Sequence, residues 1–256
     1  MDVHFGCTAC GRCCANLRLP LAIDEAIQWL ERGHTVELLC EAVPWPLEPA
    51  SGDAMAQYKR AVTFGARSGT LPVRIGVILA ATHEGSWPNL TEDKRCGVYD
   101  ERPMVCRIYP AEVNPFVPFS TTAKGCPPEA WDTSLPAFAR NGHWESDGLS
   151  ATIERSRNAM RRDARYKDAI CSALNISLAA LANEGYVIHR PTAQHLLETL
   201  KRVSAGEGND EALSDWAIAS YGVSIRDTLA SVGATVCDRL PGAHAGVEYL
   251  PLCASA

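Results

Sequence analysis

The stretch that most restricts the fold of this chain is CTACGRCC, residues Cys7 to Cys14, which places four cysteines within eight residues. Cys7, Cys10 and Cys13 follow the C-x2-C-x2-C spacing, which lets several sulfur atoms converge on one centre while the backbone turns around it. Gly11 supplies the backbone freedom that such a tight turn needs. We expect Cys14 to point away from Cys13, so the fourth thiolate indicates a second centre, a bridging role or a cluster larger than one ion.

The rest of the composition is that of an ordinary globular protein. The chain has 256 residues, is 46% hydrophobic and contains 11 cysteines. Its first residues lack a basic segment followed by an apolar one, and its most apolar run, residues 75–81, is too short to cross a bilayer, so we expect a cytoplasmic protein without membrane attachment. Cytoplasmic cysteines are usually kept as thiols, which favours metal binding over a disulfide framework. The net charge of -6 provides no general attraction to nucleic acid.

The distribution of residue types changes near residue 145. Before this point lie most of the prolines and cysteines, and after it come long stretches rich in Ala, Leu, Arg and Glu. We therefore predict a cysteine-cluster metal-chelating domain over residues 1–145 and a helical region packed on it over residues 146–256. The fold class that we expect is mainly α, with an irregular, metal-tied N-terminal half that has little strand, and a helical C-terminal half.

Local sequence patterns predict where the individual elements lie. In the first half we expect Asp24 to cap a short helix that stops at Gly33, residues 73–81 to form a buried strand, and Pro103 to begin another short helix. In the second half the apolar spacing predicts helices at residues 153–183, 192–206, 210–220 and 224–236.

Three more cysteines, Cys96, Cys106 and Cys126, stand further along the first half, and Pro127 follows the last of them as in a bacterial ferredoxin run. Together with the first run they form four phrases of sequence: Phe5–Cys14, Arg95–Tyr99, Arg102–Pro110 and Cys126–Pro127. In this order the phrases resemble the YkgJ-type CxxCxxCC cysteine-cluster family, whose members are described as zinc- or iron-chelating proteins. The resemblance covers half of the chain and implies seven chelating positions: Cys7, Cys10, Cys13, Cys14, Cys96, Cys106 and Cys126.

The chain departs from the family pattern at Trp87, where members commonly have a cysteine, so an eighth expected thiolate is absent. Two tetrahedral zinc sites need eight ligands, which seven cysteines supply only if one bridges or if a histidine such as His83 or His4 completes the set. A single 4Fe-4S cluster needs four ligands, which leaves three for redox or structural work. The count favours an iron-sulfur cluster over zinc, and thiolate-rich ligation argues against magnesium or calcium.

Charged and aromatic residues stand beside these cysteines. Tyr99 and Tyr109 either pack around the metal and keep it dry or are simple core aromatics. Four arginines are placed to offset the negative charge of metal-bound thiolates, or are ordinary surface residues. They are Arg12, Arg95, Arg102 and Arg107.

The other cysteines and arginines have simpler interpretations. Five arginines between residues 155 and 165 are interrupted by acidic residues, which favours a solvated helix with ion pairs over a nucleic-acid surface. Isolated cysteines usually behave as small buried hydrophobic residues. We expect this of Cys40, Cys171, Cys237 and Cys253.

The leading hypothesis is a metal-binding protein whose cysteine cluster holds an iron-sulfur cluster or zinc. The alternatives are an iron-sulfur oxidoreductase or modifying enzyme, a structural zinc site in an interaction module, and a thiol-redox sensor. The sequence contains no recognisable nucleotide, hydrolase or zincin motif, and it names no general acid or nucleophile. We therefore predict no catalytic residue, and the substrate and any protein partner stay open.

Overall fold

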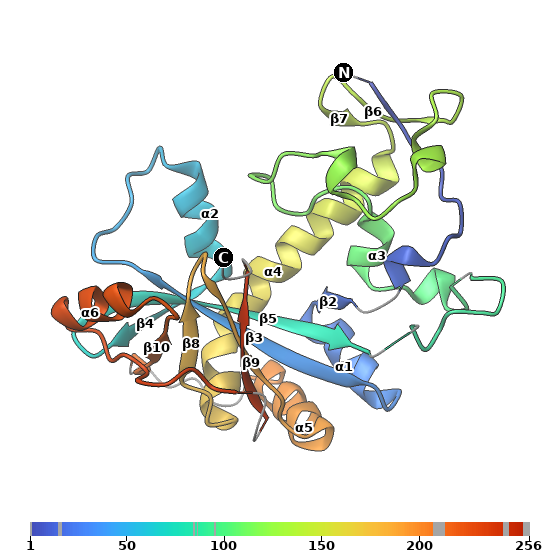
Figure 1. The fold of residues 1–256 in the computed structure, drawn as a ribbon. Coiled ribbons are helices and arrows are strands. Elements are labelled where there is room, and N and C mark those ends of the chain that lie inside the picture. Colours follow the sequence, from blue (N-terminus) through green and yellow to red (C-terminus); the bar gives the residue numbers. More distant parts are fainter. Residues whose placement is uncertain are drawn as a thin grey trace. The chain divides into compact units, whose positions relative to one another are not determined.

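The structure is a computed structural model that describes residues 2–14, 17–83, 85, 87–94, 96–206, 213–242 and 246–252 (Figure 1). The chain forms two compact units, and each unit is built from two separate stretches of sequence. Unit 1 contains Met1–Leu21 and Ala81–Ala159, and unit 2 contains Ala22–Ala80 and Met160–Ala256. The division into domains at residue 145 stays a prediction.

Strands make up far more of the molecule than the sequence analysis predicts. About 35% of the chain is helix and about 25% is strand, arranged in one sheet of three strands and another of eight. The fold class is therefore α+β, and the prediction of a mainly α fold with a helical C-terminal half is wrong. The physical reason is that a short apolar run of sequence is compatible with a buried helix and with a buried strand. Pairing with distant strands then decides which of the two forms.

The sheet of unit 2 is arranged around strand β3 (Thr35–Pro44). This strand pairs in parallel with β8 (Leu178–Leu181) and antiparallel with β9 (Gly185–His189). The predicted strand at residues 73–81 is confirmed. The other strands of the unit are β4 (Phe64–Ser68), β5 (Leu71–Thr82), β10 (Ala217–Ala219) and β11 (Val247–Pro251).

Helices α1 (Ile23–Glu31) and α5 (Ala193–Ser204) pack against each other in unit 2 (Figure 1). The predicted start of the second of these helices is confirmed, because the Thr192 side chain accepts a hydrogen bond from the backbone N–H of His195 at 3.3 Å. The unit also contains α2 (Ala54–Val62). In the part of the chain that the structure describes, no helix combines the length and the apolar character needed to cross a membrane.

The helices predicted elsewhere in the second half are partly wrong. The expected helix at residues 153–183 is α4 (Asp147–Ala173), and Asn175 follows it with a φ of 54°, a left-handed conformation that often ends helices. The chain then enters β8 and β9 instead of continuing as a helix. Of the helix expected at residues 210–220, residues 207–212 lie outside the described residues, and β10 occupies part of the rest. The last expected helix is α6 (Val223–Ser231).

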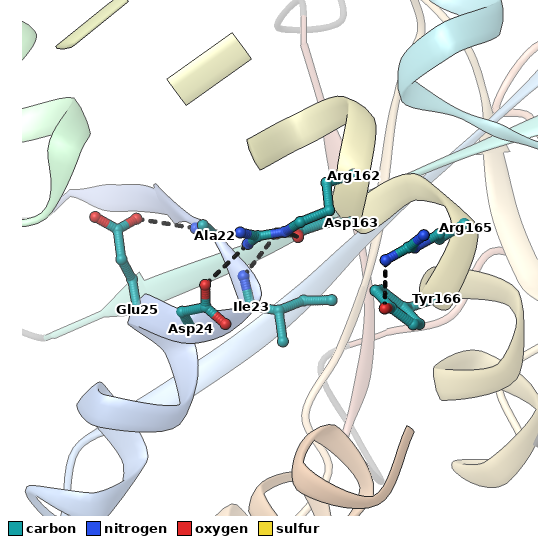
Figure 2. A network of polar contacts seen from close by, with 8 residues as sticks. All are labelled: Ala22, Ile23, Asp24, Glu25, Arg162, Asp163, Arg165 and Tyr166. Atoms are coloured by element: carbon teal, nitrogen blue, oxygen red, sulfur yellow. Dashed lines mark hydrogen bonds and ion pairs between the residues drawn. The ribbon is translucent and has the colours of Figure 1, made fainter. Parts of the chain in front are cut away.

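A polar network holds the start of α1 within unit 2 (Figure 2). The buried carboxylate of Asp163, on α4, accepts a hydrogen bond of 2.8 Å from the backbone N–H of Ile23. The Arg162 guanidinium contacts both Asp163, at 2.8 Å, and Asp24, at 3.0 Å. The prediction that Asp24 caps α1 is therefore wrong. The helix begins after Ala22, whose N–H donates to the Glu25 carboxylate at 3.0 Å, and Asp163 from another helix accepts from the next N–H. The ion pairs expected on the arginine-rich helix are confirmed.

Unit 1 combines a small sheet with short helical turns. Its antiparallel sheet has the order β1 (Val3–His4), β6 (Ala137–Arg140) and β7 (His143–Trp144). The Phe5 ring packs on Trp131 and Phe138, with ring centroids 4.9 and 5.4 Å apart, and this anchors the segment that leads into the cysteine run. The remaining elements of the unit are β2 (Arg18–Leu21), α3 (Met104–Ile108) and four 3-10 turns at Arg12–Cys14, Tyr99–Glu101, Thr121–Ala123 and Pro128–Trp131.

Candidate metal centre

The first four cysteines lie on a loop that ends in the 3-10 turn Arg12–Cys14. Gly11 has a φ of 71°, in the left-handed region that glycine tolerates, and its carbonyl oxygen accepts a hydrogen bond of 2.9 Å from the N–H of Cys14. The Sγ atoms of Cys13 and Cys14 are 3.8 Å apart. The expectation that Cys14 points away from Cys13 is therefore wrong. In a tight turn with three residues per turn, neighbouring side chains are not forced to opposite sides as they are in a strand.

The segment that carries Cys96 lies beside this turn. The backbone N–H of Trp87 donates a hydrogen bond of 2.9 Å to the carbonyl oxygen of Cys14. Cys96 forms an isolated β-bridge with Leu90, which keeps the loop from 87 to 96 closed on itself. Trp87 is buried, at 6% exposure. The backbone of Trp87, the residue that stands where family members commonly have a cysteine, is thus joined to the cysteine run, and sequence spacing alone did not indicate this.

Tyr109 connects the third and fourth cysteine phrases. Its hydroxyl oxygen lies 3.6 Å from the Sγ atom of Cys126 and accepts a hydrogen bond of 3.1 Å from the backbone N–H of Gly125. Tyr109 directly follows α3, the helix that bears Cys106 and begins after Pro103 as predicted. Of the two alternatives for Tyr109, the contact with Cys126 favours packing beside the cysteines, and the hydroxyl contact with sulfur is a feature that sequence reasoning missed.

The thiols of unit 1 act on one another electrostatically. Burial, followed by the neighbouring thiols, raises the pKa of Cys13 to about 12, and burial and neighbouring thiols also raise the pKa of Cys14 and of Cys126. A bound cation would favour the thiolate forms, because each thiolate would otherwise add negative charge beside the others. The thiols that take part are Cys7, Cys10, Cys13, Cys14, Cys96 and Cys126.

Six of the seven predicted ligands interact electrostatically with one another, all except Cys106, but they form no closed coordination site among the described residues. Among the described residues, no three Cys, His, Asp or Glu side chains are arranged to hold a metal ion. The chemistry of the donor set nevertheless fits a soft metal, since cysteine sulfur selects zinc or iron-sulfur clusters over magnesium and calcium. The cysteines therefore fit a soft metal by their ligand chemistry and by their location in the same compact unit.

The residues predicted to surround the metal have different positions. Arg102 donates to the carbonyl oxygen of Tyr99 at 2.9 Å and lies over its ring, 3.6 Å from the centroid. Tyr99 is 61% exposed, so it is neither a core aromatic nor a cover for buried thiols. The Nδ1 atom of His4 is hydrogen-bonded to the carbonyl oxygen of Leu135 at 2.7 Å.

The remaining candidates are less informative. Arg12 is exposed, and Arg107 lies on α3. His83 follows the end of β5. Arg95 lies outside the described residues.

Seven cysteines gathered in one small unit with little regular structure place this part of the chain in the class of cysteine-rich domains. Residues 6–127 match the CxxCxxCC family model, described as "Putative zinc- or iron-chelating domain". The first half of the chain therefore carries a domain of the CxxCxxCC family, and the match leaves residues 128–256 outside. No curated protein and no solved structure matches the chain.

Proposed function

We propose that unit 1 binds a metal centre through the thiolates of its cysteine phrases. The observation that carries this proposal is the gathering of thiols around the turn Arg12–Cys14, where two sulfur atoms are 3.8 Å apart and four further thiols act on their pKa values. These thiols stay protonated on their own, and a bound cation would favour their thiolate forms by compensating the charge. The proposed ligands are Cys7, Cys10, Cys13, Cys14, Cys96, Cys106 and Cys126.

The first candidate for the metal is a single 4Fe-4S cluster. Such a cluster takes four thiolates, so seven cysteines are sufficient even though Trp87 replaces one that the family commonly has. The cluster would supply one-electron redox chemistry, and the surrounding thiols and Tyr109 would set its environment. An oxidoreductase or modifying enzyme is the activity that would follow from this cofactor.

Zinc is the second candidate, and the geometry of one sulfur pair favours it. Zinc–sulfur bonds of about 2.3 Å in a tetrahedral site place the sulfur atoms roughly 3.8 Å apart. The Cys13 and Cys14 sulfur atoms already have this separation. A zinc ion held in this way would stabilise the loops of unit 1, and the protein would act as a structural interaction module.

A reducing compartment suits either metal. None of the ten cysteines among the described residues takes part in a disulfide. Thiols in the cytoplasm are kept reduced, which leaves them available to a metal. We therefore place the protein in the cytoplasm.

Metal and sulfide analysis of protein purified without oxygen tests the proposal. Iron with acid-labile sulfide and a visible absorption band would identify an iron-sulfur cluster, whereas zinc with a flat visible spectrum would identify the structural site. A protein that contains neither metal, and takes up neither after reduction, would disprove metal binding by this domain.

Two single replacements test which residues are the ligands. Cys10→Ser and Cys106→Ser should each remove most of the metal, because the first variant loses a proposed ligand from the first cysteine phrase and the second loses one from the third phrase. The matched control is Cys237→Ser in unit 2, whose thiol donates to the carbonyl oxygen of Arg239 and which should keep the full metal content. Full metal retention in both ligand variants would exclude the proposed convergence of the phrases.

A further inference from the structure

Tyr109 reaches from the helix that bears one proposed ligand to a second proposed ligand. It directly follows α3, in which Cys106 lies three residues earlier, and its backbone N–H donates to the carbonyl oxygen of Val105 at 3.0 Å. Its side chain extends to Cys126, where 3.6 Å separates the hydroxyl oxygen from the Sγ atom. One side chain therefore joins the third and the fourth cysteine phrases of unit 1.

The ring of Tyr109 has a contact that does not involve its hydroxyl group. The ammonium group of Lys124 lies over the ring, 5.8 Å from the centroid, and it also forms an ion pair with the carboxylate of Glu112. The Lys124 side chain is only 10% exposed, so water competes little for this contact. A cation over an aromatic face is attracted to the ring itself. A phenylalanine at position 109 would therefore keep this contact.

The hydroxyl oxygen of Tyr109 accepts two hydrogen bonds in the structure. The backbone N–H of Gly125 donates to it at 3.1 Å, and the Cys126 thiol donates to the same oxygen. A phenol can also donate its own O–H, which neither of these two bonds uses. The group is therefore able to exchange roles with the sulfur atom.

Metal binding would reverse the hydrogen bond between Tyr109 and Cys126. A cysteine binds a metal as a thiolate, so the sulfur atom loses its proton and becomes an acceptor. The Tyr109 O–H then turns toward the sulfur by rotation about its C–O bond, while Gly125 continues to donate to the oxygen. A hydrogen bond to an ionised acceptor is roughly twice as strong as one between neutral groups. The contact is therefore stronger in the metal-bound form than in the metal-free form.

We propose that Tyr109 is a positioning residue of the metal centre, whose hydroxyl donates a hydrogen bond to the metal-bound thiolate of Cys126. This inference rests on the proposed function, because it requires Cys126 to be a ligand. The hydrogen bond stabilises the metal-bound form and withdraws electron density from the sulfur atom, which makes the thiolate less reactive. In an iron-sulfur cluster it would also change the reduction potential.

A single replacement removes the hydroxyl and keeps the ring. In Tyr109→Phe the proposed hydrogen bond is lost, and the matched control Tyr99→Phe makes the same change on a side chain that is 61% exposed. Reduced, metal-free protein is loaded with Zn²⁺, which binds thiolates, and competition with a chelator measures its affinity. We expect Tyr109→Phe to weaken zinc binding about 10-fold or more, as is typical when the partner of a metal ligand is removed. Tyr99→Phe should bind zinc as the wild type does.

Alkylation of the zinc-loaded proteins separates a hydrogen bond to one sulfur atom from a general loosening of unit 1. Iodoacetamide reacts with the thiolates, and mass spectrometry measures the rate at each cysteine. In Tyr109→Phe we expect Cys126 to react several-fold faster than in the wild type, whereas Cys7 and Cys96 keep their wild-type rates. Equal acceleration at all three cysteines would assign Tyr109 a purely structural role and overturn the inference.

The remaining outcomes distinguish this inference from the proposed function. Wild-type zinc affinity together with wild-type alkylation of Cys126 in Tyr109→Phe would overturn the inference and leave metal binding intact. A wild-type protein that takes up no zinc would contradict both. The variant should stay folded by circular dichroism, because Gly125 is exposed and water replaces the acceptor that its N–H loses.

Discussion

At the scale of single residues, the backbone turn at Gly11 and the position of Trp87 decide which residues lie beside one another around the cysteine run. The turn brings the sulfur atoms of Cys13 and Cys14 to 3.8 Å, although adjacent side chains diverge in most extended segments. Trp87 is held against this turn by the hydrogen bond from its N–H to the carbonyl oxygen of Cys14. The backbone at position 87 is therefore next to the candidate ligand Cys14.

Replacing Trp87 tests whether a sulfur atom at this position becomes a ligand. Removal of a buried tryptophan costs about 3–5 kcal/mol of stability, so both Trp87→Cys and Trp87→Ser should be less stable than the wild type. The serine variant is the matched control, because it loses the indole without gaining a thiol. Competition with a chelator should show that the cysteine variant holds its metal more tightly than the serine variant. Equal affinities would place position 87 outside the coordination sphere.

At the scale of elements, the first N–H groups of helices in unit 2 are bound by side chains that are adjacent in sequence in one helix and far away in sequence in another. Thr192 caps α5 from the adjacent position, and the sequence predicts it. At the start of α1 the local Glu25 carboxylate accepts from the N–H of Ala22, but the carboxylate that accepts from Ile23 comes from Asp163 on another helix, and the sequence does not indicate it.

Removing the buried carboxylate should destabilise unit 2 more than removing the exposed one. Asp163→Ala leaves the N–H of Ile23 without its acceptor and removes one of the two carboxylates that contact the Arg162 guanidinium, which costs about 1–3 kcal/mol. The control is Asp24→Ala, which loses only an exposed ion pair with Arg162 and should cost about 0–1 kcal/mol. Urea unfolding of the two variants measures the difference. A cost for Asp24→Ala as large as that for Asp163→Ala would assign the main stabilising role to the surface pair.

The cap of α5 provides a second test at this scale. Thr192→Ala should lower the free energy of unfolding by about 1 kcal/mol, because the N–H of His195 loses its acceptor. Thr192→Ser keeps the hydroxyl oxygen and should stay close to the wild type. Thermal unfolding followed by circular dichroism compares the three proteins. A serine variant as unstable as the alanine variant would show that the methyl group, and not the cap, is the stabilising part.

At the scale of the whole molecule, the proposed metal centre belongs to one of the two compact units. Unit 1 contains short turns and a three-stranded sheet, whereas unit 2 contains β3 and β9, both of which have buried apolar residues. Metal binding is coupled to folding where ligands come from loops that cannot close without it. The two units should therefore respond differently to loss of metal.

Hydrogen exchange of the metal-loaded and metal-free protein tests this difference. We expect amide protection to fall in the turn Arg12–Cys14 and in α3 after the metal is removed, because these segments carry proposed ligands. Protection in β3 and β9 should be maintained. Loss of protection in β3 to the same extent as in α3 would show that the metal supports the entire chain.

The sequence by itself determined which residues are the candidate ligands, because the cysteine phrases lie in short segments whose spacing and residue types indicate a thiolate centre without reference to the fold. It also determined β5 and the start of α5, because a buried apolar run and a capping threonine are local signals. Tertiary structure alone decided that the chain after α4 forms β8 and β9, which pair with β3, and that Asp163 accepts a hydrogen bond from Ile23. Those contacts join residues far apart in the sequence, and no local preference for helix or strand specifies which distant partner completes a sheet.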